Sequence, residues 1–191
     1  MKTYPIVLFF ACCLISCSKA DYPLIEIKTS LGSIEIEIYE DKAPITAKHF
    51  LANVDSLIFE KACFYRVVHM DNQEGRDIKI EVIQGGLFHD SIVDKMPCIE
   101  HERTDKTGIL HLDGVISMAR NKPGTACTEF FICVGDQPHL DAGGLRNSDN
   151  EGFAAFGKVT KGMDVVRKIQ KQSEKGQMLI NRIPISVMNR K

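Results

Sequence analysis

The segment between Gly114 and Val134 constrains the fold more than any other part of the sequence. It contains two apolar runs, residues 115–119 and 130–134, which are rich in β-branched and aromatic side chains. Such side chains favour a pleated, half-buried strand. Between the two runs, Lys122-Pro123-Gly124 predicts a turn, because proline followed by glycine is a strong turn signal. We therefore expect two central β-strands that are separated by a polar turn segment.

Alternating side chains predict a hairpin near the start of the domain. In residues 24–29 and 33–39, apolar side chains alternate with charged ones, and Leu31-Gly32 separates the two segments. This period of two predicts strands with one buried face and one solvated face. We interpret the glutamates of this hairpin as part of the solvated face and not as catalytic carboxylates.

Two other segments have the period of a helix. Residues 44–58 begin with a proline, which suits a first helical turn, and carry apolar residues three and four positions apart. Residues 163–172 show a similar pattern. Further strands are expected at residues 64–69, 78–83, 153–159 and 183–188. Many short strands with two helices indicate a single, mainly β domain, either closed or sandwiched.

The first 16 residues are predicted to be a signal peptide. Lys2 supplies a positive charge, and residues 6–14 form an apolar run that is too short to span a bilayer as a helix. The sequence Leu14-Ile15-Ser16-Cys17 that follows resembles a bacterial lipobox, in which the cysteine becomes the first residue and carries lipid. We expect lipidation at Cys17 and a domain of residues 17–191. An ordinary secretory peptide is the alternative.

This N-terminus predicts a membrane-anchored lipoprotein of the bacterial cell envelope that faces the periplasm. Several acyl chains anchor a protein stably, whereas one chain is marginal. The sequence leaves open whether the membrane is the inner or the outer one. The 24 basic and 25 acidic residues give a formal net charge of −1, so no basic excess points to a nucleic-acid partner. The sequence has no heptad seam, and we expect a monomer.

Four cysteines lie within the predicted domain. They are Cys63, Cys98, Cys127 and Cys133. Export permits disulfides, and four cysteines allow three pairings that the sequence does not distinguish. Cys63 and Cys133 lie in apolar, strand-like runs, which favours buried free thiols at these two positions. Since the sequence contains no CxxC motif, a zinc knuckle or a thioredoxin-type site is not expected.

Four segments, in order along the chain, resemble the cyclophilin-type peptidyl-prolyl isomerases. Together they span roughly residues 24–188 when the flanking strands are included. The segments are Phe64-Tyr65-Arg66-Val67-Val68, Gln84-Gly85-Gly86, Ile116-Ser117-Met118-Ala119-Arg120 with Glu129-Phe130-Phe131-Ile132, and residues 153–159. The resemblance implies a closed eight-stranded antiparallel barrel, capped by two helices, with a packed interior and an active groove on its outer surface.

The resemblance also implies the activity, which is rotation of X–Pro peptide bonds between cis and trans. Such a reaction needs no cofactor. Arg66 matches the family's catalytic arginine, and Gln84 matches the glutamine that orients it. Phe131 corresponds to the floor of the proline pocket, and Ala119 and Leu140 correspond to its surroundings. Because Phe130 and Phe131 point to opposite faces of a strand, one should be core and the other groove.

Several positions depart from the family pattern at the expected substrate site. Val82 stands where the family has a methionine, and Glu129 replaces a glutamine that lies near the arginine. His139 replaces a tryptophan, and Phe153 replaces a histidine. A carboxylate at position 129 is expected either to hold Arg66 in place or to compete with substrate for it. We expect activity with an altered substrate preference. The segment at 70–77 is also longer than is usual in the family.

Three functions compete at this point. The first is a membrane-tethered isomerase that assists the folding of exported proteins by acting on proline-containing polypeptides. The second is a catalytically weak scaffold that binds proline-containing segments. The third is a barrel that carries a small ligand, but bulky isoleucine and phenylalanine side chains should fill a small barrel. The histidines at 89, 101 and 111 have spacings that fit no known metal-ligand pattern, and no metal is expected.

Overall fold

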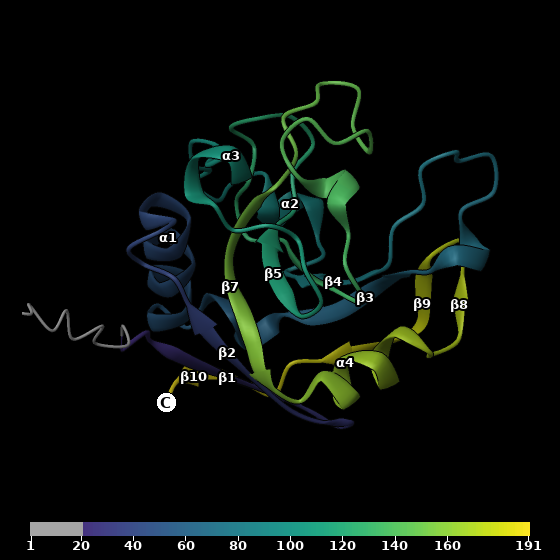
Figure 1. Cartoon of the computed structure of the whole chain (residues 1–191). Helices are drawn as coiled ribbons and strands as arrows, with labels where there is room; N and C mark the ends of the chain where they lie inside the picture. The colour runs from purple at the N-terminus through teal and green to yellow at the C-terminus, as the bar shows by residue number, and fades with distance from the viewer. Residues whose placement is uncertain (1–20) are drawn as a thin grey trace, which may run out of the picture.

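The computed structural model describes residues 21–191 (Figure 1). The predicted signal peptide and the predicted lipidation site at Cys17 lie outside these residues. No helix within residues 21–191 has both the length and the apolar character needed to cross a bilayer.

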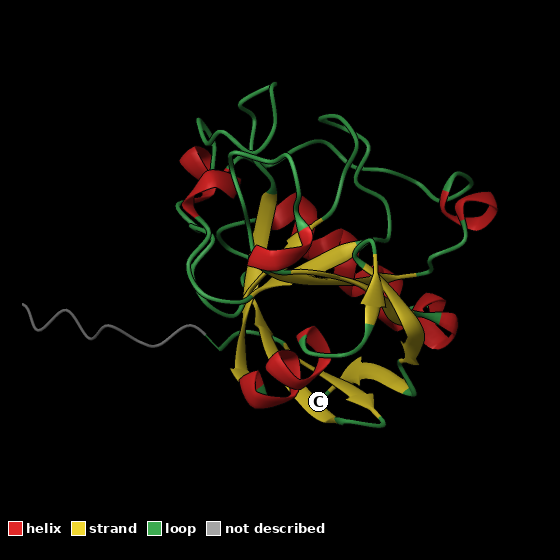
Figure 2. Cartoon of the chain, turned by 90° about the vertical axis from the view of Figure 1, so that its right-hand side faces the viewer, coloured by secondary structure: helices red, strands yellow, loops and turns green. Residues whose placement is uncertain are grey.

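Ten strands form one antiparallel sheet, in the order β10-β1-β2-β7-β5-β6-β4-β3-β9-β8. In Figure 2 these strands curve around one another, and long loops extend from one end of the sheet. The strands are β1 (Leu24–Thr29), β2 (Gly32–Ile38), β3 (Cys63–Val68), β4 (Val82–Gly86), β5 (Val115–Met118), β6 (Phe130–Cys133), β7 (Ala154–Lys161), β8 (Glu174–Lys175), β9 (Met178–Pro184) and β10 (Val187–Arg190).

The prediction of a closed, eight-stranded barrel is therefore wrong in two respects. The sheet has ten strands, and within residues 21–191 no pairing joins its two end strands, β10 and β8. One predicted strand, residues 183–188, divides between β9 and β10, which pair with β3 and β1 respectively. The connecting residues Ile185 and Ser186 bond to Ala62 and Lys28, so the chain crosses here between distant strands of the sheet. A short hairpin, β8–β9, adds the remaining strand.

Residues 21–191 contain four α-helices, where two were predicted for the domain. They are α1 (Pro44–Asp55), α2 (Asp90–Val93), α3 (Thr104–Thr107) and α4 (Met163–Gln170), and three 3₁₀ turns are η1 (Ile58–Lys61), η2 (Met70–Asn72) and η3 (Pro138–Leu140). The two long helices correspond to the predicted ones, with α1 against β7 and β10, and α4 against β2, β3 and β4. Helix α1 ends before its predicted limit because Leu57 has a left-handed φ of 57°.

Phenylalanine and isoleucine side chains fill the interior. Phe130 on β6 is fully buried, and its ring lies 5.8 to 5.9 Å from the rings of Phe50, Phe59 and Phe64. Five isoleucines of β1 and β2 are also fully buried in this cluster. A packed interior of this kind contradicts the hypothesis of a barrel that carries a ligand inside.

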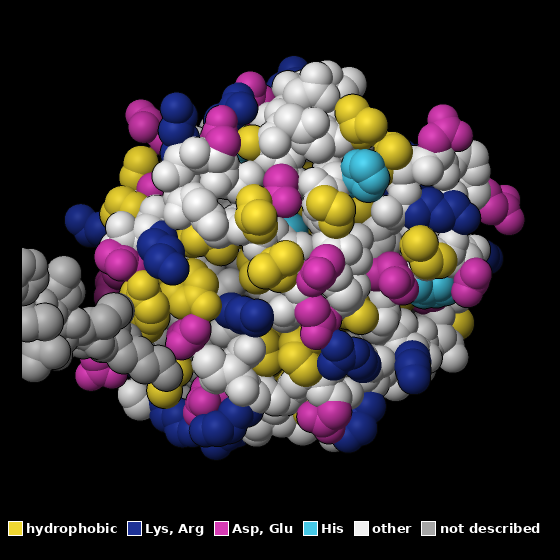
Figure 3. Space-filling view, in the orientation of Figure 1, with side chains coloured by type: hydrophobic (Ala, Val, Ile, Leu, Met, Phe, Trp, Pro, Cys, Tyr) yellow, Lys and Arg dark blue, Asp and Glu magenta, His cyan; other side chains and the backbone are white. Residues whose placement is uncertain are grey.

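One glutamate of the first hairpin is not solvated as predicted. Glu35 is buried, and its carboxylate makes ion pairs of 3.0 Å with Lys161 and 2.5 Å with Lys191. These lysines and Thr160 hold the pKa of Glu35 at about 2. On the face shown in Figure 3, acidic and basic side chains are interspersed around hydrophobic ones.

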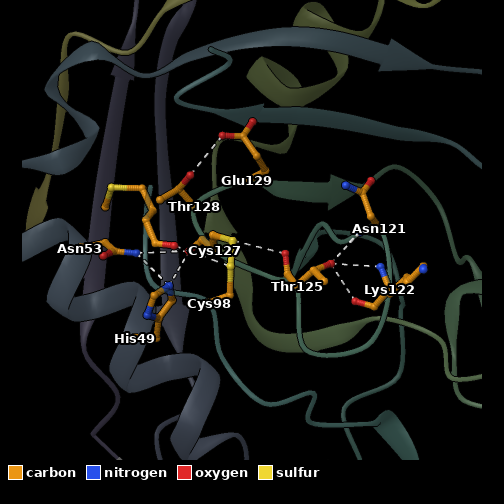
Figure 4. Close-up of a disulfide and its surroundings, with 10 residues drawn as sticks. His49, Asn53, Cys98, Asn121, Lys122, Thr125, Cys127, Thr128 and Glu129 are labelled. Atoms are coloured by element: carbon orange, nitrogen blue, oxygen red, sulfur yellow. Dashed lines mark hydrogen bonds between the residues drawn. A yellow bond between two sulfur atoms is a disulfide. The ribbon is translucent and has the colours of Figure 1, made fainter. Parts of the chain in front are cut away.

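The structure resolves the choice between cysteine pairings. Cys98 and Cys127 form a disulfide, and Cys63 and Cys133 are free and buried, as predicted for these two. Figure 4 shows the disulfide beside His49 and Asn53, which both point to the Cys127 carbonyl. The disulfide joins the long 87–108 segment to the loop that precedes β6.

We expect loss of this disulfide to cost about 3–4 kcal/mol of unfolding free energy, because the sequence separation of 29 residues closes a long loop in the unfolded chain. The measurement is urea unfolding of residues 18–191 with and without the double replacement Cys98→Ser and Cys127→Ser. Thiol titration in denaturant should find two reactive cysteines before reduction and two more after it. Four thiols before reduction would contradict the pairing.

Candidate active site

A cavity of about 600 Å³ opens beside β3, β4 and β6. It lies next to a small hydrophobic cluster that is distinct from the main core. The cavity brings together most residues that the sequence assigned to the site, namely Arg66, Val82, Gln84, Ala119, Glu129, Phe131, Leu140 and Phe153. It also contains residues that sequence reasoning missed, among them Tyr65, Arg76, Ile80, Phe88, Arg146 and Met178.

The register of the sheet sets three of these side chains in a row. Arg66 of β3 pairs with Gln84 of β4, and Gln84 pairs with Phe131 of β6. Residues opposite one another on neighbouring strands point to the same face. Phe130, one position earlier, points into the main core, so the predicted division between one core ring and one groove ring is confirmed.

Phe131 forms the apolar part of the cavity with Val82, Leu140 and Phe153. Its ring lies edge-on to Phe153 at 5.3 Å and stacks on His111 at 5.9 Å. Two hydrogen bonds hold the buried His111 ring, at 2.7 Å to Asp141 and 3.0 Å to Ser117. His111 is thus a support beneath Phe131, a role that its isolated position in the sequence did not reveal.

His139 does not line this cavity, contrary to its predicted place in the substrate site. It is half-exposed on η3, whereas the next residue, Leu140, is buried against the apolar cluster. Successive residues of a 3₁₀ turn point in directions about 120° apart, so both cannot face the cavity. The His139 carbonyl instead accepts a hydrogen bond from the Arg146 backbone.

Two neutral glutamines hold the Arg66 guanidinium. Nη1 donates to Gln84 Oε1 at 2.8 Å, and Nε and Nη2 donate to Gln177 Oε1 at 3.1 and 2.6 Å. Burial lowers the pKa of Arg66 from its ordinary value, and the nearby positive charge of Arg76 contributes in the same direction. A guanidinium this basic stays protonated at neutral pH.

Gln177 is a site residue that the sequence did not indicate. It lies with Gly176 in the two-residue turn between β8 and β9, where both residues have positive φ. Its backbone N–H donates to Glu174 at 2.6 Å, and its side-chain amide donates to the Asn72 carbonyl at 2.9 Å. These bonds fix the amide oxygen that faces Arg66. Only the pairing of β9 with β3 brings the turn to this position.

A chain of hydrogen bonds leads from Arg66 to Glu129. Gln84 Nε2 donates to the Tyr65 hydroxyl at 2.6 Å, and that hydroxyl donates to Glu129 Oε2 at 2.5 Å. The other carboxylate oxygen accepts from the Leu87 N–H at 2.7 Å. Glu129, which was predicted to hold Arg66 in place or to compete for it, is thus connected to Arg66 only through Tyr65 and Gln84.

Gly86 makes room for the Glu129 carboxylate. Its φ of 147° is rarely adopted by residues with a side chain, and a Cβ atom at this position would overlap the carboxylate. The glycine therefore allows Glu129 to lie against the backbone of residues 86–88.

Replacing Glu129 by glutamine should change how stability depends on pH. Burial raises the pKa of this carboxyl above its ordinary value of 4.5, and its hydrogen bonds oppose the shift. The folded state then binds the proton more tightly than the unfolded state, so wild type loses stability as the pH rises through the raised pKa. The unfolding free energy of wild type minus that of Glu129→Gln should grow as the pH is lowered from about 7 towards 4.5.

Urea unfolding of both proteins at a series of pH values measures this difference in unfolding free energy. The contributions of the other titrating groups are the same in both proteins and cancel. A difference that shrinks with falling pH would mean that the hydrogen bonds outweigh burial and depress the pKa.

Within residues 21–191, no group of three His, Cys, Asp or Glu side chains is arranged to hold a metal ion. The chemistry of the cavity rests on a buried guanidinium, neutral amides and an apolar pocket.

Comparison with known proteins identifies the family of this chain. Residues 24–189 match the sequence profile of the cyclophilin type peptidyl-prolyl cis-trans isomerase/CLD family. A peptidyl-prolyl cis-trans isomerase of Acinetobacter baylyi is 38% identical over 157 residues, which cover 82% of this chain and 76% of that protein. Peptidyl-prolyl cis-trans isomerase A of Dickeya dadantii is 36% identical over 152 residues, which cover 78% and 72%.

A solved structure shows the same fold. A cyclophilin type peptidyl-prolyl cis-trans isomerase of Cryptosporidium parvum superposes with a TM-score of 0.68 at 22% identity, over 89% of this chain and 98% of that chain. The fold, the matched profile and the named relatives point to one class of enzyme. The chain therefore belongs to the cyclophilin-type peptidyl-prolyl cis-trans isomerase family, and it is an enzyme of that class.

Proposed function

We propose that Arg66 catalyses isomerisation by donating a hydrogen bond to the nitrogen of the twisted X–Pro amide, while the apolar pocket over Phe131 holds the proline ring. The observation that carries this proposal is the position of the guanidinium. It lies in the same cross-strand row as Phe131, and its partners, Gln84 and Gln177, are both neutral. No carboxylate within ion-pairing distance, among the described residues, neutralises it.

The physical basis is the electronic change during rotation. A planar amide has a barrier of about 18–20 kcal/mol, and its nitrogen accepts no hydrogen bond because the lone pair is delocalised. When the C–N bond twists, the nitrogen becomes pyramidal and regains its lone pair. A donor aimed at this nitrogen stabilises the twisted form alone, and such selective stabilisation is what accelerates a reaction.

The magnitudes are consistent with this mechanism. Uncatalysed exchange takes tens to hundreds of seconds, so a turnover of roughly 10 per second requires the barrier to fall by about 4 kcal/mol. A charge-assisted hydrogen bond supplies about 1.5–3 kcal/mol. Exclusion of water and positioning of the proline in the pocket supply the remainder.

We further propose that the clients are exported proteins and that the enzyme is tethered to a bacterial membrane through lipid on Cys17. The support is the N-terminal sequence, in which an apolar run ends at Ser16-Cys17. Expression of the full chain in a bacterium and mass spectrometry of the N-terminal peptide test the proposal. A diacylated Cys17 that disappears in Cys17→Ser supports it. An unmodified cysteine, or cleavage at another bond, would refute the anchor.

Exchange spectroscopy on a short Ala-Pro peptide tests the catalytic role. Residues 18–191 should produce exchange between cis and trans signals on the millisecond-to-second scale, and Arg66→Ala should slow this exchange by roughly 10- to 150-fold while still binding the peptide. The C. parvum cyclophilin has also been crystallised in the presence of the dipeptide Ala-Pro. If the folded wild type shifts the peptide signals without exchange, the chain is a binding scaffold for proline-containing segments.

A further inference from the structure

We infer that one end of the active-site cavity binds a carboxylate side chain of the substrate, so that this isomerase favours X–Pro segments with an acidic residue close to the proline. Arg76 and Arg146 form this end of the cavity, which we call the arginine end. The inference rests on the proposed function, because it assumes that the substrate polypeptide lies in the cavity.

The arginine end is built by two loops. Arg76 comes from the loop between η2 and β4, which projects at the right of Figure 1 in blue and teal. Arg146 comes from the loop between η3 and β7. Its guanidinium donates to Gln73 Oε1 at 3.0 Å and to the Ile78 carbonyl at 2.6 Å. Both arginines line the cavity together with Arg66.

Within residues 21–191, these two arginines and Arg66 have no carboxylate partner. Arg182 has none either, but it does not line the cavity and lies over the Phe88 ring at 4.2 Å. Four arginines elsewhere, Arg103, Arg120, Arg167 and Arg190, each form an ion pair with an aspartate or glutamate. Within residues 21–191, no carboxylate lies within 4.0 Å of the arginines at 66, 76 and 146. Residues 1–20 contain no aspartate or glutamate that could supply one.

Gathering three uncompensated guanidinium groups is electrostatically unfavourable. Burial lowers the pKa of Arg146, and the charges of Arg76 and Arg66 lower it further. Arg146 remains protonated, and because it lines the cavity with Arg76 and Arg66, this end of the cavity has a positive potential. An anion placed there would relieve the repulsion, and guanidinium groups bind carboxylates through paired hydrogen bonds.

The opposite end of the cavity has a different charge. Glu129, Asp90 and Asp94 line it there, and Arg120, which also lines it, is neutralised by Asp149. The two ends lie at opposite ends of β4. From Gln84, the strand runs back through Val82 towards the arginine end and forward through Gly86 towards Glu129. A substrate with its proline over Phe131 therefore meets positive charge on one side only. The acidic residue should be favoured on that side of the proline.

Peptide pairs that differ only in Glu or Gln test this inference. Glutamate and glutamine have the same shape, so their ratio of kcat/KM isolates the charge. We would place the pair in turn at each of the two positions before and the two positions after the proline. Wild type should favour Glu by about 3- to 10-fold on one side of the proline, as expected for a partly exposed ion pair, and the preference should weaken in high salt.

Charge reversal gives the sharpest variant. The Arg76 side chain is exposed and makes no hydrogen bond within the described residues, so Arg76→Glu should leave the fold intact. This variant should abolish the preference for Glu and favour Lys at the same position. Arg146→Gln should reduce the preference as well. Lys171→Glu, which makes the same charge change at an exposed residue just after α4 and away from the cavity, is the matched control and should keep the wild-type ratio.

Two results would overturn the inference. One is a Glu-to-Gln ratio near one at all four positions in an active wild type. The other is a preference that survives in both Arg76→Glu and Arg146→Gln. If no peptide is isomerised, it is the catalytic proposal that fails. The ratio of the affinities of the folded protein for the Glu and Gln peptides then tests the inference in place of the ratio of kcat/KM.

Discussion

Arg66→Ala should lower kcat/KM for a short neutral X–Pro peptide by roughly 10- to 150-fold, which corresponds to the loss of a charge-assisted hydrogen bond. The guanidinium lies in the cavity and has no carboxylate partner in the part of the chain that the structure describes, so its removal leaves no buried charge unpaired. Of the two glutamines whose oxygens it contacts, Gln84 lines the cavity and Gln177 is half-exposed, so water can bind both oxygens in the variant. The melting temperature should therefore change little, and the loss should lie in catalysis.

A matched variant separates charge from geometry. Arg66→Lys keeps the positive charge but cannot contact both glutamines with a planar fork, so it should recover only part of the activity. Peptide affinity, measured by titration, should fall much less than kcat in both variants, because the donor acts on the twisted amide. An Arg66→Ala protein with a rate within twofold of wild type would contradict the proposed mechanism.

Phe130→Ala should destabilise the fold by about 3–5 kcal/mol, which is the usual cost of removing a buried phenylalanine. Its ring is fully buried among three other phenylalanine rings, so deletion leaves a closed cavity in the main core. Urea unfolding of residues 18–191 measures the change. The total free energy of unfolding of a small domain is only about 5–15 kcal/mol, so the variant should be marginally stable at 37 °C.

The neighbouring residue provides the control. Phe131 is also an aromatic residue of β6, but its ring borders the open cavity, so water can occupy the space left in Phe131→Ala. We expect a smaller loss of stability in that variant and a larger loss of affinity for proline peptides. If Phe131→Ala proved the more destabilising of the two, the assignment of one ring to the core and the other to the groove would need revision.

Local sequence pattern determined much of the sheet. Alternation in β1 and β2 and the apolar runs of β5 and β6 predicted strands because a strand's two faces have different environments. The buried thiols of Cys63 and Cys133 followed from the same reasoning. The segment at 78–83 was less predictable. It becomes a strand only at Val82, since the Gln73 side chain bonds both backbone groups of Ile80 in the preceding loop.

The resemblance to cyclophilins identified residues that the structure brings into one cavity, but it did not give their contacts. Glu129 was predicted to hold Arg66 in place or to compete with substrate for it, and in the structure Tyr65 and Gln84 stand between the two side chains. His139 was assigned to the cavity, but the 3₁₀ turn points Leu140 there instead. Side-chain direction and hydrogen-bond partners depend on neighbours from other strands, which a single segment does not specify.

The sequence by itself determined most of the strands, the two long helices and the family, because these depend on periodicity and on short ordered motifs. Only the tertiary structure decided which distant residues meet. The pairing of β9 with β3 brings Gln177 to Arg66 across 111 positions of sequence, and two loops bring Arg76 and Arg146 to one end of the cavity. Such contacts arise from the packing of whole elements, so no local pattern records them.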